Sequence, residues 1–367
     1  MAELEPQVRW TLVPGAPNAK LLGLASRLPL VGARFATRDY RDAIARELAT
    51  HDYDAVVLDQ YGMSWAIPLV RSFARRRPVF VHVSHDFETR VTDQIARNFT
   101  GDPVRKYLLK QNARKTGLAE VDLARSCRLL VTLTEEDRDS FAEINPALSC
   151  VVLPPGYAGR RAPPRVIDTG VPRRAVIVGS FSWIAKQINL ERMLNAAAGI
   201  LPPNSIELHV IGLVPAPLLS RLKQRFPWVA FRGFVDDLAE ELSHARVALV
   251  PEEIGGGFKL KILDYIFSRV PVAAVEPALG GIPRRVKDHF LVEADVTELL
   301  QNVAAVIDDV GRLDHLQNGA FAEADGLFDW NLNGQRLLES LELILGESSL
   351  QGETRMRAGR PATVHAT

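Results

Sequence analysis

The sequence has few cysteines, no net charge and no long apolar run. Its two cysteines, Cys127 and Cys150, lie in or beside predicted strands, where small buried residues fit better than metal ligands or a disulfide. The 44 basic and 44 acidic residues cancel, so the overall charge gives no argument for a nucleic-acid partner. No stretch approaches the roughly 20 apolar residues of a membrane-spanning helix. The start, MAELEPQVRW, lacks a signal-peptide core, so we predict a cytoplasmic protein.

Several catalytic signatures are also missing. The sequence contains no H-E-x-x-H, no paired C-x-x-C, no nucleophile elbow and no Walker A lysine in G-x-x-x-x-G-K-[ST]. These absences exclude the best-known metalloprotease, serine hydrolase and nucleotide hydrolase patterns.

An alternation of strands and helices runs through both halves of the chain. The 367 residues suit two domains with separate cores. The predicted strands are short apolar runs, typical of parallel sheets that are covered on both faces, at 8–13, 53–58, 79–83, 127–133, 150–153, 175–180, 207–211, 229–231, 247–250, 270–275 and 289–292. We predict an N-terminal domain at 1–157, a C-terminal domain at 158–334, a helix at 335–346 that packs back on the first domain, and a disordered tail at 347–367.

The most informative stretch is HARVALVPEEIGGGFKLKILDYIFSRVPVAAVE, at 244–276. A buried strand ends at Pro251 and is followed by Glu252 and Glu253, the three glycines 255–257, two lysines and a helical apolar pattern. Strand, glycine loop and helix form the geometry in which backbone N–H groups hold a phosphate. The alternative is a tight turn with solvated lysines.

A second polar group follows the strand at 79–83, in the sequence SHDFE at 84–88. Ligands of α/β sheets bind beyond the carboxyl ends of strands, which places His85 and Asp86 where chemistry occurs. His85 could donate to a phosphate or a sugar hydroxyl, or transfer a proton. Asp86 could equally cap the next helix, and His82 is predicted to be a core residue.

Two further features leave alternatives open. The strand at 175–180 ends in Gly179 and Ser180, where a ligand can approach the backbone, and Lys186 is a candidate cation there or a surface lysine. Residues 104–115, VRKYLLKQNARK, form a basic amphipathic helix, which either lies on an anionic membrane or is an ordinary exposed helix.

Three segments of the C-terminal half resemble the donor-binding domain of GT-B glycosyltransferases, most closely family 4. They are AVIVGSFSW, VAFRGFVDDLAEELSHARVALVP and GGGFKLKILDYIFSRVPVAA, which together place the likeness at roughly residues 150–335. HDFE at 85–88 is similar to the family's H-N/D-x-E in the acceptor domain. The resemblance implies two Rossmann-like doubly wound domains that face each other across a cleft.

It also implies a retaining, metal-independent transferase with a nucleotide-sugar donor and a glycan, glycolipid or small-molecule acceptor. His85 would touch the transferred sugar or its phosphate, Lys261 would neutralise the leaving diphosphate, and Asp264 would bind the ribose hydroxyls, while Lys259 would remain at the surface. The full set of donor-binding residues that the resemblance implies is Gly179, Ser180, Lys186, Phe234, Gly256, Gly257, Lys261 and Asp264.

The sequence departs from the family pattern in three places. Gly256 stands where the family has its first glutamate, which contacts the donor sugar, so that Glu252 or Glu253 would have to supply this contact. Asp264 replaces the second glutamate, and the first β–α unit of the N-terminal domain is not evident. The missing first β–α unit and Gly256 favour an alternative, a catalytically weak or inactive partner or scaffold protein in polysaccharide assembly. A two-domain protein that only binds a small ligand would leave Lys261 and Asp264 without a role.

Overall fold

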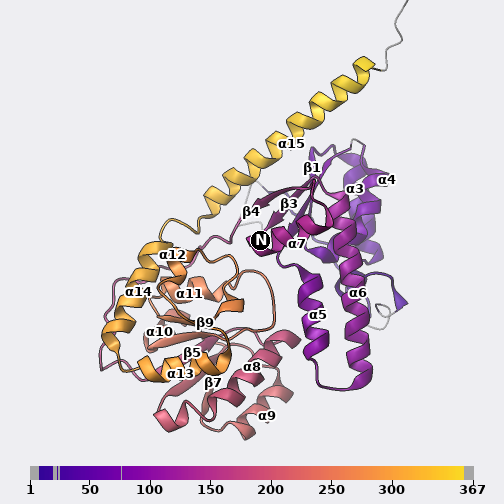
Figure 1. Cartoon of the computed structure of the whole chain (residues 1–367). Helices are drawn as coiled ribbons and strands as arrows, with labels where there is room; N and C mark the ends of the chain where they lie inside the picture. Colours follow the sequence, from indigo (N-terminus) through magenta and orange to yellow (C-terminus); the bar gives the residue numbers. More distant parts are fainter. Residues whose placement is uncertain (1–7, 20–22, 24, 76, 359–367) are drawn as a thin grey trace, which may run out of the picture.

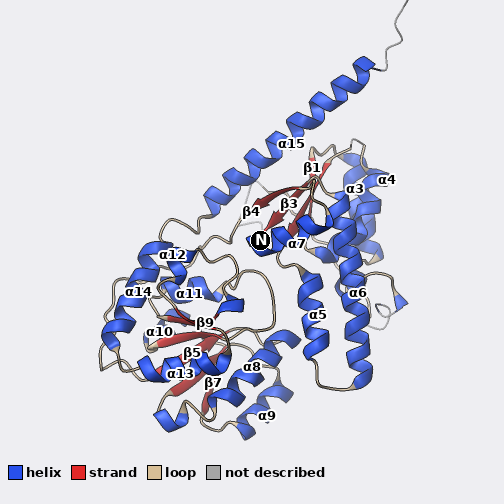
Figure 2. Cartoon of the chain, viewed as in Figure 1, coloured by secondary structure: helices blue, strands red, loops and turns tan. Residues whose placement is uncertain are grey.

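The computed structural model describes residues 8–19, 23, 25–75 and 77–358. They form two α/β domains, each built around its own parallel sheet (Figures 1 and 2). This arrangement confirms the predicted fold class, two Rossmann-like domains. Both cysteines are free thiols, as predicted. No helix among the described residues is long and apolar enough to cross a membrane.

The N-terminal sheet has four parallel strands in the order β1-β2-β3-β4. The strands are β1 (Ala55–Asp59), β2 (Val79–Ser84), β3 (Leu129–Thr132) and β4 (Ser149–Val152). The helices around this sheet are α2 (Leu30–Phe35), α3 (Arg38–Thr50), η1 (Tyr61–Ala66), α4 (Ile67–Phe73), α5 (Glu88–Asn98), α6 (Pro103–Ser126) and α7 (Glu135–Ile144). α5 and α6 pack along each other and extend toward the second domain (Figure 1).

The C-terminal sheet has six parallel strands in the order β10-β9-β8-β5-β6-β7. The strands are β5 (Arg174–Val178), β6 (Glu207–Ile211), β7 (Val229–Gly233), β8 (Val247–Val250), β9 (Val272–Val275) and β10 (Leu291–Glu293). The helices are α8 (Ile184–Ala197), η2 (Pro202–Asn204), α9 (Ala216–Arg225), α10 (Leu238–Ser243), α11 (Lys261–Phe267), η3 (Glu276–Ala278), α12 (Arg284–Lys287), α13 (Val296–Val306) and α14 (Val310–Ala324). The direction of strand addition reverses between β5 and β8, which creates a ligand crevice at the carboxyl ends of these two strands.

The central strands of this sheet follow directly from their composition. Every residue of β8 (VALV) and β9 (VAAV) is buried, because helices cover both faces and no polar side chain needs water. Ala and Val also let the covering helices approach the sheet closely. The loop at 251–260 begins directly at the end of the buried strand β8.

The predicted strand at 8–13 is wrong. Residues 8–13 are irregular, and Arg9 contacts Glu47 of α3 and His51, which follows that helix, instead of a neighbouring strand. The alternating pattern of this segment resembles a strand, but the segment does not join the sheet. Among the described residues, nothing pairs with the outer edge of β1, and Val57 in the middle of this strand is 52% exposed. In the described part of the chain, the sheet therefore extends from β1 in one direction only.

The last helix, α15 (Trp330–Ala358), returns to the N-terminal domain. Its side chains Leu337, Leu341 and Ile344 pack on the face of the N-terminal sheet that carries Val81 and Val131. The helix is longer than the predicted 335–346, because it continues to Ala358 into the segment for which we predicted disorder. Residues 359–367 of that predicted tail lie outside the described residues.

Candidate functional site

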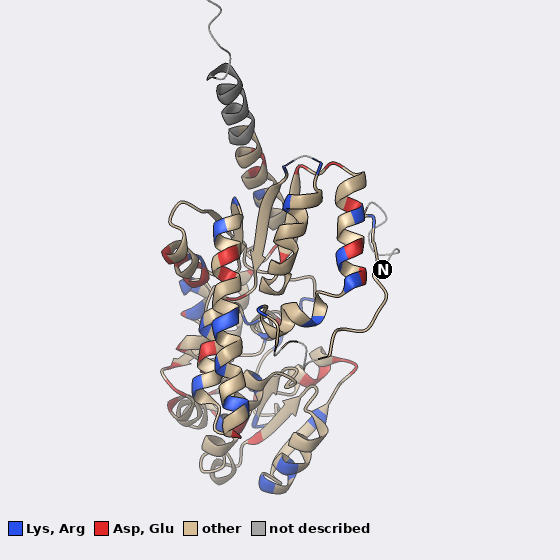
Figure 3. Cartoon of the chain, turned by 90° about the vertical axis from the view of Figure 1, so that its right-hand side faces the viewer, with Lys and Arg blue, Asp and Glu red and all other residues tan. Residues whose placement is uncertain are grey.

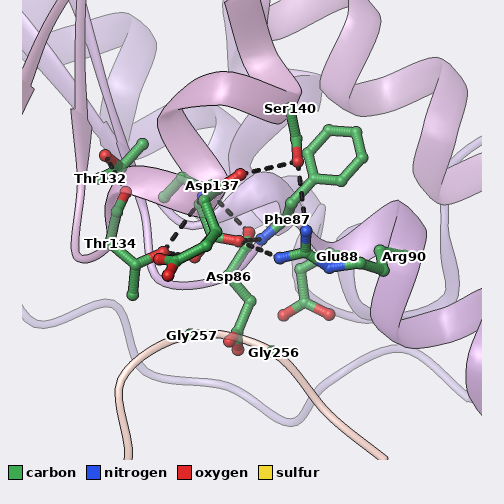
Figure 4. A network of polar contacts seen from close by, with 12 residues as sticks. Asp86, Phe87, Glu88, Arg90, Thr132, Thr134, Asp137, Ser140, Gly256 and Gly257 are labelled. Atoms are coloured by element: carbon green, nitrogen blue, oxygen red, sulfur yellow. Dashed lines mark hydrogen bonds and ion pairs between the residues drawn. The ribbon is translucent and has the colours of Figure 1, made fainter. Parts of the chain in front are cut away.

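Two loops from different domains meet at the site. One is the glycine loop, residues 251–260, which joins β8 to α11; the other joins β2 to α5 and carries His85 and Asp86. Figure 4 shows the side chain of Asp86 pointing at Gly256 and Gly257. A Cβ atom added at Gly257 would lie 2.0 Å from Oδ1 of Asp86 and 2.5 Å from the carbonyl oxygen of His85, and Gly257 has a φ of +62°. Only glycine fits this close approach.

Side chains of α5 extend the contact between the domains. The N–H of Gly255 donates to Oε1 of Gln94 over 3.1 Å. Arg192 of α8 donates to Oδ1 of Asn98 over 2.7 Å. A Cβ atom at Gly256 would lie 2.8 Å from Cγ2 of Val91, so α5 rests directly on the glycine loop.

Lys261 stands at the start of α11 and pairs with Glu252. The two side chains are only 12% and 10% exposed, and the carboxylate accepts a hydrogen bond from the ammonium. Burial lowers the pKa of Lys261, and the charge of Glu252 opposes this shift. A lysine held in this way carries its positive charge beneath the glycine loop.

Lys259 does not remain at the surface, which corrects the prediction from the sequence. Its ammonium donates to the carbonyl oxygens of Gly256 and Gly257, the second over 3.3 Å. α11 begins only at Lys261, so Lys259 belongs to the loop and folds back under it. Burial lowers its pKa, while the nearby carboxylate of Asp86 acts in the opposite direction.

Asp86 does not cap α5, so the alternative interpretation of this residue as a helix cap is wrong. Glu120 of α6 does so instead, because its carboxylate accepts the N–H groups of Glu88 over 2.7 Å and of Thr89 over 2.8 Å. Asp137, also buried, accepts the N–H of Phe87 over 3.1 Å (Figure 4). These two acids leave the carboxylate of Asp86 free to reach the other domain.

Burial keeps several of these acids partly protonated near neutral pH. It raises the pKa of Asp86 to about 6, a shift that Lys259 opposes. It raises the pKa of Glu88 to about 8, with Asp86 and Glu120 adding to the effect. It raises the pKa of Glu120 to about 7, against the hydrogen bonds from Thr89. Asp86 at the domain contact and two acids of the adjoining α5 and α6 therefore carry charges that depend on pH.

His85 is held by a residue that the sequence did not single out. Its Nε2 lies 2.8 Å from Oδ1 of Asp59, the last residue of β1, and both side chains are partly exposed. This hydrogen bond raises the pKa of His85 and lowers that of Asp59. Sequence reasoning could have found Asp59 from the topology, because β1 and β2 are parallel neighbours and their carboxyl ends, with Asp59 and His85, meet at one edge of the sheet. His82, in contrast, is fully buried and bonds to the carbonyl of Leu58 over 3.0 Å, as predicted for a core residue.

The remaining predicted donor residues lie along the carboxyl edge of the C-terminal sheet. Gly179 and Ser180 follow β5, and Lys186 lies in the first turn of α8, close enough for its charge to lower the pKa of Lys259 and Lys261. Asp264 is half-buried in α11, and burial raises its pKa. Phe234 stands apart, two strands away after β7, and is 84% exposed.

Comparison with known proteins places the chain among glycosyltransferase-like folds. Residues 172–309 match the family described as "Glycosyl transferases group 1". TarM of S. aureus is 11% identical over 82% of this chain and 58% of its own, with a TM-score of 0.62. Sucrose-phosphate synthase from Thermosynechococcus elongatus is 17% identical over 88% of this chain and 78% of its own, with a TM-score of 0.62. HepE from Anabaena, in complex with UDP-glucose, is 17% identical over 88% of this chain and 83% of its own, with a TM-score of 0.61.

No curated protein matches the sequence. At these identities the likeness to solved structures shows the fold alone, the GT-B arrangement of two Rossmann-like domains. The chain spans 58% of the length of TarM.

Proposed function

We propose that the protein is a glycosyltransferase that moves a sugar from a nucleotide-diphosphate donor to an acceptor, with retention of configuration. The observation that carries this proposal is the meeting of the glycine loop, with its lysines, and the HDFE segment of the other domain. The loop lies within the segment that matches the glycosyltransferase family model. A donor bound at the loop would thus present its sugar to His85.

Each predicted donor residue has a physical role in this proposal. Gly256 and Gly257 offer backbone N–H groups to the diphosphate, and Lys261 neutralises the charge that develops on it as the sugar leaves. Asp264 accepts hydrogen bonds from the ribose hydroxyls, and Phe234 packs against the nucleobase. In the absence of a donor, Glu252 balances the charge of Lys261. Gly179, Ser180 and Lys186 complete the donor side.

The transfer itself needs positioning and charge stabilisation more than covalent chemistry. A neutralised diphosphate is a better leaving group, and the acceptor then attacks from the side that the diphosphate has left. Closure of the two domains excludes water and strengthens these electrostatic interactions. Because the two lysines supply positive charge at the loop, we propose that the transfer needs no metal.

A binding and hydrolysis experiment tests this proposal. The protein is mixed with UDP-glucose, UDP-N-acetylglucosamine, ADP-glucose and GDP-mannose, and melting temperature and slow donor hydrolysis are measured with and without EDTA. A donor at about 100 times its Kd stabilises the protein by about 2.7 kcal/mol, which raises the melting temperature by several degrees. Failure of every nucleotide sugar and diphosphate to bind would overturn the proposal, and loss of hydrolysis in EDTA would overturn its metal independence.

The alternative is a GT-B protein that binds nucleotide sugars weakly or not at all and acts as a partner in polysaccharide assembly. The short N-terminal sheet and the missing carboxylate at Gly256 favour it. Measured hydrolysis or transfer would exclude this alternative. A folded chain without any nucleotide binding would support it.

We also propose that α6 brings the protein to an anionic membrane that carries a lipid-linked acceptor. Val104, Tyr107 and Leu118 are 66%, 60% and 62% exposed on this helix. Lys110 and Arg114 lie on the same outward side, and Figure 3 shows basic positions along the helix. Exposed apolar and basic side chains together are typical of helices that lie on a membrane surface.

Vesicle sedimentation tests the membrane contact. The protein should bind vesicles with 30% phosphatidylglycerol at low salt and release at high salt, and Lys110→Ala/Arg114→Ala should weaken this binding. Lys223→Ala/Arg225→Ala in α9 removes the same charge elsewhere and serves as the control. Equal loss in both double variants, or no binding at any salt concentration, would overturn the role of α6.

A further inference from the structure

Asp86 is a carboxylate that reaches into the opposite domain without a partner of its own. Among the described residues, none donates a hydrogen bond to its side chain, although the side chain is only partly exposed. Its Oδ1 lies 3.3 Å from the position that a Cβ atom would take at Gly256. A charged group in such a place has lost water and gained no hydrogen bond in exchange.

The other acids around the glycine loop are tied to groups of their own domain. Oε1 of Glu252 pairs with Lys261, while its buried Oε2 has no hydrogen-bond partner among the described residues. Glu253 accepts the N–H of Val296 over 3.2 Å and contacts Arg192 over 3.4 Å, so it serves α13 and the domain contact. The two acids that the sequence suggested as substitutes for a carboxylate at 256 are thus held by contacts within the C-terminal domain.

We infer that Asp86 binds the hydroxyl groups of the donor sugar, and that it takes this role across the domain boundary because position 256 has no side chain. The inference rests on the proposed function and names the residue that reads the sugar. An ionised carboxylate can accept two hydroxyl protons at once, which suits a pair of neighbouring sugar hydroxyls. Lys259 lies close enough to favour the ionised form of Asp86.

This placement has a consequence for selectivity. A donor-sugar contact from the same domain as the diphosphate site would form in the open state of the protein. A contact from the opposite domain forms only when the domains meet, so the protein distinguishes between donor sugars only in its closed state. The nucleotide alone gains nothing from Asp86, because a carboxylate does not attract a diphosphate.

The test compares the Asp86→Asn variant with the wild type by calorimetric titration. Each protein is titrated with UDP and with UDP-glucose. If the wild type binds another sugar nucleotide of the panel above more tightly, that sugar nucleotide and its diphosphate replace them. We expect the affinity for the sugar nucleotide to fall about 10- to 100-fold, as for loss of a charge-assisted hydrogen bond. The affinity for the bare diphosphate should stay within about twofold or increase. Asp93→Asn, on the same helix and paired with Arg97 at the surface, is the matched control and should change neither affinity.

Three outcomes decide the matter. A wild type that binds no nucleotide overturns the proposed function and this inference with it. A wild type that binds both ligands, with Asp86→Asn unchanged or equally weakened for both, overturns the inference and leaves the function standing. A selective loss of sugar-nucleotide binding supports the inference.

Discussion

At the scale of single residues, the pair formed by Lys261 and Glu252 links stability to ligand binding. Both side chains are almost completely buried, and each neutralises the other. Breaking a buried ion pair by removing one partner is strongly destabilising, because the other charge is left without compensation. In the proposed function a donor diphosphate competes with Glu252 for the same ammonium group.

We expect Lys261→Met to lower the free energy of unfolding by about 3–5 kcal/mol and to abolish binding of nucleotide diphosphates. The double variant Lys261→Met/Glu252→Gln should recover most of the stability but not the binding. Denaturant unfolding and calorimetric titration measure the two effects separately. Binding of a diphosphate by the stable double variant at wild-type affinity would contradict the phosphate role of Lys261.

The second residue-scale prediction concerns Asp59. Its hydrogen bond to His85 raises the pKa of His85, so the imidazole stays protonated to higher pH than a free histidine. In Asp59→Asn this pKa falls, and the alkaline limb of the activity profile should move to lower pH. NMR titration of His85 checks the assignment directly. An unchanged titration of His85 in the variant would show that Asp59 does not set its charge.

At the scale of elements, the glycine loop and the amino end of α5 form the contact between the domains. We predict that Gly257→Ala separates them, because the new Cβ atom would lie 2.0 Å from Asp86 and has no room to move. Gly326→Ala is the matched control, since Gly326 has a similar φ of +76° but nothing within 4 Å of an added Cβ atom. Both variants carry backbone strain of about 1 kcal/mol. Only Gly257→Ala should increase the radius of gyration in small-angle X-ray scattering, and equal profiles would refute this.

The elements themselves were largely predictable, while their partners were not. β8 and β9 follow from unbroken apolar runs and β2 from an apolar run that His82 interrupts, as burial on both faces requires. Residues 8–13 alternate like a strand yet form none, although the outer edge of β1 has no partner among the described residues, because a local pattern does not determine which tertiary contacts a segment makes. The same limit applies to the site. Strand ends predicted His85 and the glycine loop, but the contacts of Asp59 and Asp86 depend on strand order and on the placement of the domains.

At the scale of the whole molecule, the buried acids Asp86, Glu88 and Glu120 make stability depend on pH. Burial raises the pKa of Glu88 from 4.5 to about 8, so the folded protein holds a proton that the unfolded chain releases. Stability contributed in this way is present below about pH 4.5 and is lost as the pH rises toward 8. Asp86 and Glu120 act in the same direction up to about pH 6 and about pH 7.

We therefore predict that the melting temperature falls between pH 6.5 and pH 8 at constant ionic strength, above the range in which the lowered pKa of the buried His82 has the opposite effect, and that Glu88→Gln flattens this dependence. Gln keeps the shape of the protonated acid and removes its titration. Differential scanning calorimetry of both proteins over this range measures the difference. Parallel curves for the two proteins would mean that Glu88 titrates like a solvated acid.

Because α15 packs on the first domain, the N-terminal sheet is synthesised long before the helix that covers one of its faces. The face of the N-terminal sheet that carries Val81 and Val131 is covered by side chains near Ile344, which the ribosome adds roughly 190 residues after the sheet itself is complete. At usual rates of synthesis this delay lasts roughly 10 to 40 s. During that interval the nascent chain exposes an apolar sheet face, so the first domain to be made is the last to be finished. A ribosome stalled before α15 would thus display a natural binding surface for chaperones.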